Sequence, residues 1–117
     1  MRKKLIGLKY KGKEINIEAY VVPKWYEGIG LMFRRRKNAK TLLFEFKRPV
    51  KMAIHSWFVF FPFIAIWIDG KGKVVDIKTV KPFEFNILPS GRFTRLIEIP
   101  LDKKYNFLKF PSGKRKI

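Results

Sequence analysis

The chain has 117 residues, and its 27 lysines and arginines against 9 aspartates and glutamates give a formal net charge of +18 at pH 7. It contains no cysteine and one histidine, which excludes disulfides, thiolate metal sites and cysteine nucleophiles and argues against a Ser-His-Asp triad or a histidine-rich metal centre. Because 47% of the residues are hydrophobic, the chain can bury a core, and its length fits a single domain over residues 1–117. We place the core at about residues 4–110, followed by a short basic tail over 111–117, and we expect no cofactor and no metal.

The N-terminal third predicts a β-hairpin followed by a short helix. Residues 4–10 and 14–22 are predicted strands on either side of a Lys11-Gly12-Lys13 turn, and apolar and polar residues alternate in the second. Pro23 ends the second strand and favours the first turn of a helix near residues 23–30, which two glycines limit to a turn or two.

A strand over residues 41–46, closed by Arg48-Pro49, precedes a long apolar run. From Met52 to Ile68, seventeen residues carry no formal charge, which is the lower edge of the length that spans a bilayer as a helix. Pro62 would break such a helix, and aromatic and β-branched residues dominate the run. We therefore expect no transmembrane segment and predict two strands buried on both faces, over residues 54–60 and 63–69.

The last third predicts a second hairpin and a final strand. Asp69-Gly70-Lys71-Gly72 is the clearest turn in the chain, with a return strand over residues 73–80. Another alternating strand spans residues 93–99 and stops at Pro100. Many short strands and little helix predict a mainly β fold, a single compact antiparallel β-sandwich or partly closed β-barrel with one short helix.

Several short motifs follow one another in a defined order. They are Gly30-Leu31-Met32-Phe33-Arg34, TLLFEF at 41–46, Ile54-His55-Ser56-Trp57-Phe58, Phe61-Pro62, the stretch 66–75, Lys81-Pro82 and Leu96-Ile97-Glu98-Ile99-Pro100. Over about residues 14–101, this ordered set resembles the domain of unknown function 192 family, also called uncharacterised protein family 0127. The resemblance implies a compact, mostly β, barrel-like domain with one short helix. That family has no established biochemical activity, so the resemblance implies a fold and a cleft but no reaction.

The chain departs from the family pattern at polar positions. Phe60 stands where relatives commonly have Arg, and Ile64 stands where they have Asp. If the family's Arg and Asp form a functional pair, this chain lacks it, which disfavours an enzyme. Glu98 matches an acidic family position, and its simplest interpretation is a solvent-facing side chain or a partner of one of the many lysines.

The resemblance and the chemistry together define a candidate cleft formed by Gly30, Met32, Arg34, His55 and Asp69. His55 is the only imidazole and could act as an acid or base near neutral pH, whereas the simpler interpretation is a half-buried histidine bonded to backbone. Asp69 most simply caps its turn. Catalytic residues stay unassigned.

A dense basic cluster is the candidate anion-binding site, and it comprises Arg34, Arg35, Arg36, Lys37 and Lys40. Guanidinium groups match phosphate oxygens, while the alternative is a solvated loop with no specific role. Aromatic residues make up 16% of the chain. Some could form a stacking platform for single-stranded nucleic acid, with Trp25 and Tyr26 the best surface candidates, but most fill the core.

The charge lies outside the central apolar run. Residues 1–48 carry 14 basic and 4 acidic side chains (+10), residues 49–68 carry one lysine, and residues 69–117 carry 12 and 5 (+7). We interpret the chain as a small ligand- or partner-binding module with a strongly basic surface. The alternatives are non-sequence-specific nucleic-acid (polyanion) binding, an enzyme acting on an anionic substrate, and association with a membrane surface.

The ends of the chain and its composition bear on where it works. The N-terminus begins with basic residues but lacks a long apolar core and a small-residue cleavage site, so we expect no signal peptide and a cytoplasmic location. A chain rich in Lys and Ile and free of Cys also fits a thermophilic source, although its acidic content is low for that class. The sequence leaves the oligomeric state open.

Overall fold

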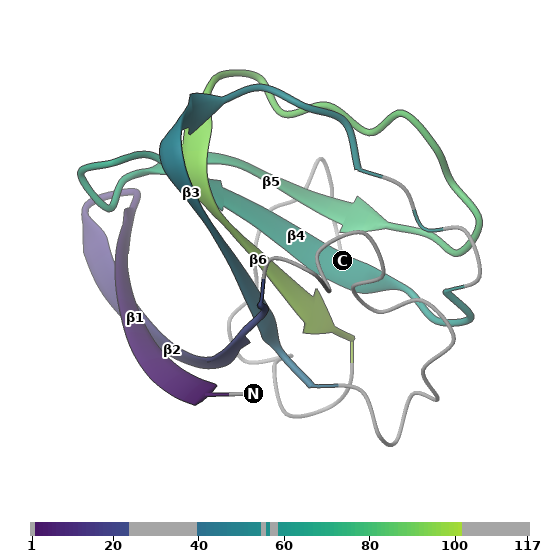
Figure 1. Cartoon of the computed structure of the whole chain (residues 1–117), viewed down its shortest axis with the longest axis horizontal. Coiled ribbons are helices and arrows are strands. Elements are labelled where there is room, and N and C mark those ends of the chain that lie inside the picture. The colour runs from purple at the N-terminus through teal and green to yellow at the C-terminus, as the bar shows by residue number, and fades with distance from the viewer. Residues whose placement is uncertain (1, 24–39, 55, 57–58, 102–117) are drawn as a thin grey trace.

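The computed structural model describes residues 2–23, 40–54, 56 and 59–101. The described part contains six strands in one sheet (Figure 1): β1 (Arg2–Tyr10), β2 (Lys13–Val21), β3 (Leu42–Val50), β4 (Phe63–Ile68), β5 (Val74–Val80) and β6 (Phe93–Pro100). The mainly β prediction is confirmed. The predicted short helix near residues 23–30 lies almost entirely outside the described residues.

The sheet is mixed rather than purely antiparallel. Its strand order is β1-β2-β3-β6-β4-β5, and the β2–β3 pair is parallel while the other pairs are antiparallel. The antiparallel prediction was wrong at this one pair. Residues 22–41 separate the two strands, and a connection of that length can cross over and return in the same direction, whereas a tight hairpin cannot.

The sheet curls into a half-barrel. The β1–β2 hairpin bends across one face of the other four strands, as Figure 1 shows. The two edge strands approach each other at one point, where the Lys9 backbone N–H donates to the Gly72 carbonyl oxygen at 2.8 Å. The partly closed barrel is therefore the correct alternative, and the sandwich is not.

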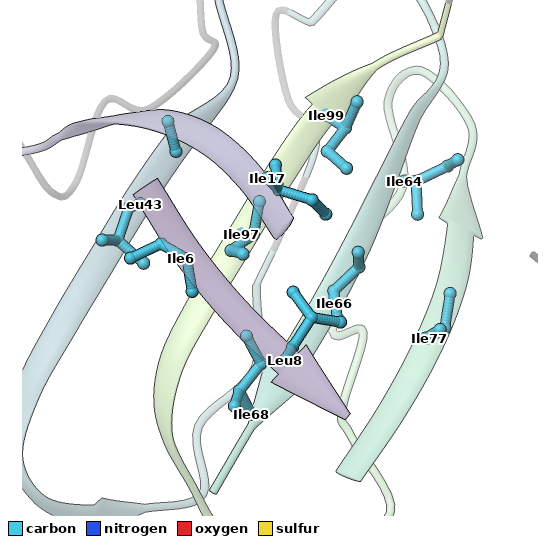
Figure 2. Packing of buried hydrophobic residues seen from close by; sticks show 11 residues of the cluster. Ile6, Leu8, Ile17, Leu43, Ile64, Ile66, Ile68, Ile77, Ile97 and Ile99 are labelled. Atoms are coloured by element: carbon cyan, nitrogen blue, oxygen red, sulfur yellow. The ribbon is translucent and has the colours of Figure 1, made fainter. Parts of the chain in front are cut away.

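Aliphatic side chains fill the interior of the half-barrel. Figure 2 shows side chains from β1 and β2 pointing toward those of the other four strands. Period-two alternation places these residues on one face of each strand. The inner cluster comprises Ile6, Leu8, Ile17, Ala19, Leu43, Ile64, Ile66, Ile68, Ile77, Ile97 and Ile99.

The outer face of the sheet carries a second cluster, rich in aromatic residues. Segments 51–62 and 81–92 contribute to its cover, because side chains from both pack with those of the strands. With both faces covered, all six residues of β4 are buried. The outer cluster comprises Val22, Leu42, Phe44, Val59, Phe61, Phe63, Ala65, Trp67, Val80, Phe93 and Leu96.

Both predicted turns are confirmed. Lys11 and Gly12 have φ angles of 51° and 75°, the left-handed pair that a tight two-residue hairpin turn requires. β3 continues past its predicted end, through Pro49 to Val50, and the register shifts between Glu45 and Val50. Proline has no backbone N–H to donate to a neighbouring strand, so it is tolerated where the pairing is already irregular.

The predicted strand over residues 54–60 was wrong in its described part. Ile54 forms only an isolated bridge to Ile87, and Ser56, Val59 and Phe60 belong to no strand. An apolar run covered on both sides has the same composition whether it is a strand or a loop packed on a sheet, so the pattern could not separate the two. Among the described residues, no helix has the length and hydropathy needed to cross a membrane.

Candidate functional site

Of the predicted cleft, the structure describes Asp69 alone, and Gly30, Met32, Arg34 and His55 lie outside the described residues. Asp69 follows β4, and its Oδ1 accepts hydrogen bonds from the backbone N–H of Lys71 at 2.8 Å and of Lys73 at 3.0 Å. These bonds close the turn between β4 and β5, so the capping interpretation of Asp69 is confirmed. Whether the five residues form a cleft stays a prediction.

Of the predicted anion-binding cluster, Lys40 is described, and Arg34 to Lys37 are not. The Lys40 ammonium lies 4.6 Å from the centre of the Tyr20 ring, and the Lys3 ammonium lies 5.9 Å from the same ring. The register explains this convergence, because Lys3 pairs with Tyr20 across β1–β2 and Leu42 pairs with Tyr20 across β2–β3. The contact is a cation–π pair on an exposed surface, and phosphate binding there is untested.

The two positions where polar family residues are replaced lie in different environments. Ile64 is 2% exposed and belongs to the inner cluster, whereas the Phe60 side chain is 61% exposed on the segment outside the half-barrel. An isoleucine inside an aliphatic core needs no functional explanation. Exposed Phe60 becomes informative through its neighbours, because a group of exposed aromatic side chains marks an interaction surface more than a single one does.

Phe60 belongs to a group of exposed aromatic residues on two neighbouring segments, which we call the aromatic loop surface: Phe60, Phe83 and Phe85. Phe83 and Phe85 are 48% and 62% exposed. The Phe60 and Phe83 rings meet edge to face, with centroids 5.4 Å apart. Exposed Met52 and Leu88 lie on the same two segments.

A buried serine joins these two segments. Ser56 is fully buried, and its hydroxyl donates to the Lys81 carbonyl at 2.6 Å and accepts from the Glu84 N–H at 2.6 Å. Its backbone N–H donates to the Glu84 carbonyl at 2.7 Å, and its carbonyl accepts from the Phe83 N–H at 2.9 Å. The bonds hold Phe83 at a φ of 59°, a conformation that few non-glycine residues adopt. Ser56 therefore presents the Phe83 ring to solvent.

Charged groups beside the aromatic loop surface are tied to backbone atoms. The Lys78 ammonium donates to the Leu88 carbonyl at 2.6 Å, and the Glu84 carboxylate accepts from the Lys81 N–H at 2.8 Å. Asp76 accepts from the backbone N–H of Ile77 and of Ser90, each at 2.9 Å. The carboxylates of Glu84 and of Asp76 on β5 are thus bonded to backbone N–H groups, while Lys51 and Lys81 are exposed on the two segments.

The outer face of the sheet also contains an ionisable group, and here the interpretation of Glu98 was wrong. Glu98 is 6% exposed rather than solvent-facing, and no ion pair or hydrogen bond joins its carboxyl to another described residue. Burial raises the pKa of this carboxyl to about 8. β6 lies between β3 and β4 in the sheet, and packed side chains cover both faces of the sheet there. The sequence could not reveal that position, because strand order is not written in the pattern of a single strand.

Trp67 lies on the same outer face. Residues that pair across the sheet form two adjacent rows, Leu42-Glu98-Ala65-Lys78 and Phe44-Leu96-Trp67-Asp76. Trp67 and Glu98 are therefore diagonal neighbours, whose Cα atoms lie roughly 7–8 Å apart in such pairs. The Trp67 side chain is fully buried, and its indole Nε1–H has no hydrogen-bond partner in the described structure. Among the described residues, no group of three or more His, Asp or Glu side chains is placed to hold a metal ion.

This architecture, one six-stranded sheet curled into a half-barrel, defines a class of small, mainly β domains. The chain belongs to the DUF192 family, described as an uncharacterized ACR, whose model matches residues 8–104. The resemblance found from the motifs is thereby confirmed.

Two curated relatives are similar over roughly two thirds of the chain. UPF0127 protein PH1112 of Pyrococcus horikoshii is 31% identical over 72 residues, which is 62% of this chain and 62% of that protein. UPF0127 protein PF1050 of Pyrococcus furiosus is 27% identical over 78 residues, or 66% of this chain and 67% of that protein. The match thus spans about three fifths of the length of the first relative.

Two solved structures share the fold. A putative transcription regulator from Sinorhizobium meliloti superposes with a TM-score of 0.70 at 19% identity, covering 96% of this chain and 90% of that one. A protein of unknown function from Novosphingobium aromaticivorans gives a TM-score of 0.71 at 16% identity, covering 91% and 78%. At these identities, the likeness establishes the architecture alone.

Proposed function

We propose that this chain is a partner-binding module whose partner is single-stranded nucleic acid, bound without sequence preference across the aromatic loop surface. The observation that carries the proposal is the exposure of Phe60, Phe83 and Phe85 on two segments that Ser56 ties together. Exposed aromatic rings stack on any base, and this mode of binding combines such rings with positive charge along the backbone path.

The charge of the chain supplies the second requirement. The net charge of +18 on 117 residues attracts a polyanion from a distance, although the charge beside the rings is modest in the described residues. Lys51 and Lys81 are exposed on the two segments that carry the rings. Stacking thus provides the local contact, and the overall charge provides the long-range attraction. The Sinorhizobium meliloti protein that shares the fold is described as a putative transcription regulator, which is compatible with this proposal.

Fluorescence anisotropy with an oligothymidylate tests the proposal. We expect the Phe60→Ala and Phe85→Ala variants to bind at physiological salt roughly 5- to 150-fold more weakly than the unaltered chain, the range that the loss of one stacked base predicts. Leu5→Ala is the matched control, because Leu5 is an equally exposed apolar residue (66%) on β1, away from both segments.

Two further arms separate stacking from charge. Lys81→Gln should weaken binding and reduce the salt dependence by about one counterion, while inorganic polyphosphate, which has no bases, should bind equally to the Phe variants and the unaltered chain. The proposal fails if oligothymidylate binding disappears at physiological salt or is insensitive to Phe60→Ala. It also fails if the Phe variants lose binding only to vesicles containing anionic lipid, because the surface then serves a membrane.

A further inference from the structure

The two edge strands of the sheet, β1 and β5, differ in regularity and in cover. The segment 81–92 contacts β5, where the Ser90 hydroxyl donates to the Val75 carbonyl at 3.2 Å. The pairing of β5 with β4 also contains a register shift. β1 is nine residues long, contains no proline and pairs with β2 without a register shift. A long, regular edge strand of this kind is a template for a further strand.

The backbone of β1 turns hydrogen-bonding groups away from β2 at alternate residues. Lys9 shows the direction, because its N–H donates to the Gly72 carbonyl at 2.8 Å, on the side opposite β2. The direction of the backbone groups alternates along an antiparallel strand, so those of Lys3, Leu5 and Gly7 point the same way as those of Lys9. Three residues in a row of alternate positions therefore offer N–H donors and C=O acceptors at the edge of the sheet.

These outward groups have no partner in the described part of the chain. On its free side β1 forms one bridge there, between Lys9 and Lys73, and no hydrogen bond reaches the outward groups of residues 3–7. Ile6 and Leu8 point toward the other strands (Figure 2), so the side chains between them face outward, and Leu5 is 66% exposed. We call residues 3–7 the β1 edge, which the turn between β4 and β5 bounds at one end.

Positive charge flanks the β1 edge. Exposed Lys3 lies at one end, and exposed Lys9 and Lys73 lie at the other. β1 itself contains no acidic residue. Glu14 and Glu18 belong to β2, on the side away from the free edge, and the Glu18 carboxylate lies 3.9 Å from the Lys3 ammonium. Both of these side chains are more than half exposed, so solvent screens the pair and leaves Lys3 available to another carboxylate.

We propose that the β1 edge binds an extended acidic segment of a partner protein, which adds to the sheet as a further antiparallel strand. The segment would exchange main-chain hydrogen bonds with β1, which is the usual basis of affinity in strand addition. Side chains on its outer face would lie opposite those of β1. An acidic residue facing Lys3, an apolar residue facing Leu5 and a second acidic residue diagonal to Lys9 match the charges and the exposed apolar side chain of the edge.

Two other occupants fit the β1 edge less well. A second copy of this chain, paired antiparallel through β1 about Leu5, would bring the basic residues of both strands together. A nucleic acid has phosphates for the lysines, but phosphate oxygens only accept hydrogen bonds and leave the outward carbonyls of Lys3 and Leu5 unpaired. Alternating donors and acceptors, spaced two residues apart, are the pattern of another main chain.

The acetylated peptide Thr-Glu-Val-Val-Thr-Glu-Thr is the probe, and amide hydrogen exchange measured by NMR is the readout. Antiparallel addition places its fourth residue opposite Leu5 and its sixth opposite Lys3. We expect the peptide, at 100 times its Kd, to slow exchange of the Lys3 and Leu5 amides by roughly 100-fold. The Ile6 amide points toward β2 and should not change.

Two methylated peptides separate strand addition from attraction between charges. Methylation of the fourth peptide nitrogen removes a donor that faces β1, and it should weaken binding roughly 2- to 13-fold, the loss of one hydrogen bond. Methylation of the fifth nitrogen, which points away from β1, is the matched control and should leave the affinity unchanged. Both peptides carry the same charge, and the protein is unaltered in this comparison.

Variants of the chain test the same contacts from the other side. Leu5→Pro removes one outward N–H and leaves the β1–β2 bonds in place, as edge strands tolerate, so it should weaken binding of the unmethylated peptide roughly 2- to 13-fold. Lys3→Gln should weaken binding roughly 1.4- to 5-fold, the range for one cross-strand charge pair. Lys51→Gln is its matched control, because it removes the same charge from an exposed lysine away from β1. If Leu5→Pro does not fold, the methylated peptides still decide.

The proposal is overturned if the two methylated peptides bind equally well, or if the peptide leaves exchange at Lys3 and Leu5 unchanged. Protection of these amides that rises with protein concentration in the absence of peptide also overturns it, because a second copy then occupies the edge. Nucleic-acid binding at the aromatic loop surface is a separate outcome. Leu5→Pro should leave oligothymidylate binding intact, and Phe60→Ala should leave peptide binding intact, so the two proposals fail independently.

Discussion

The two faces of the same sheet are built from different side chains. The inner cluster consists of isoleucine, leucine and alanine throughout, whereas the outer cluster contains four phenylalanines and a tryptophan. Among the described residues, Glu98, Trp67 and Ser56 place buried polar atoms on the outer side, and buried Thr41 directly precedes β3. The inner cluster is therefore purely aliphatic packing, whereas the outer side combines apolar packing with buried polar groups.

This difference follows from geometry. The interior of a half-barrel is closed by its own strands, so aliphatic side chains of fixed shape fill it densely. The outer face is covered in part by segments without regular structure, and their backbone polar groups need partners such as the Ser56 hydroxyl. Polar groups and aromatic rings accordingly gather where loops meet the sheet.

Truncation of the inner face should produce the largest change in stability. Ile66 is fully buried at the centre of the inner cluster, and Ile66→Ala should lower the free energy of unfolding by about 2–5 kcal/mol, because it removes apolar contacts and leaves a cavity. Urea unfolding measures this. Leu5→Ala, at a residue that is 66% exposed, should change stability by less than about 0.5 kcal/mol. Equal losses of stability in Ile66→Ala and Leu5→Ala would contradict the assignment of Ile66 to the interior of the half-barrel.

The outer face should instead make the free energy of unfolding depend on pH, through Glu98. The pKa of Glu98 is about 8 in the folded chain and 4.5 as its ordinary value, so the folded state binds the extra proton between those limits. Stability is then highest below pH 4.5 with respect to this group and falls as pH rises toward 8, by about 1.4 kcal/mol for each pH unit. Urea unfolding at pH 5.5 and 7.5 should differ by about 3 kcal/mol more in the unaltered chain than in Glu98→Gln.

Suppose instead that stability rises between pH 5.5 and 7.5, and by the same amount in the unaltered chain and in Glu98→Gln. That result would show that Glu98 is ionised and partnered. It would also make the two faces electrostatically alike.

The inner face was predictable from the sequence, and most of the outer face was not. Alternation of apolar residues in β1, β2 and β6 and the Asp69 turn signal fixed the strands within a residue or two. These signals are local, because each depends on residues that are adjacent in the chain. The family resemblance rested on the same local motifs, and the family model confirms it.

The burial of Glu98 and the bonds of Ser56 depend on contacts between segments far apart in the chain. Glu98 is buried because β6 lies inside the sheet and its outer face is covered by other parts of the chain, and a strand in isolation carries no record of its neighbours. Ser56 bonds to residues 25 and 28 positions away. The polarity of Ser56 within the apolar run was visible, but its partners were not. The cleft and the anion-binding cluster stay predictions, and of their residues the structure describes Asp69 and Lys40.

Ser56 connects stability and presentation on the outer face. Ser56→Ala leaves the Glu84 N–H without its acceptor and should cost about 1–3 kcal/mol, with weaker oligothymidylate binding because Phe83 is held less firmly. Thermal unfolding and anisotropy on the same sample measure the two effects. Ser90→Ala is the control, since Ser90 is exposed and should change neither by much. Unchanged binding in a folded Ser56→Ala variant would separate the serine from the aromatic loop surface.

The smallest effect is expected at the rim of the half-barrel, where β1 meets β3 and β6. Glu45 accepts from the Lys4 ammonium at 2.8 Å and lies 3.6 Å from Arg95 Nε, and water reaches all three side chains, which are 30–39% exposed. Because solvent screens such pairs, Glu45→Gln should cost less than about 1 kcal/mol, and the difference should shrink in high salt. Urea unfolding in low and high salt measures it. If Glu45→Gln lowered the free energy of unfolding as much as Ile66→Ala, ion pairs rather than aliphatic packing would hold the β1–β2 hairpin over the sheet. The inner face would then share the polar character assigned to the outer one.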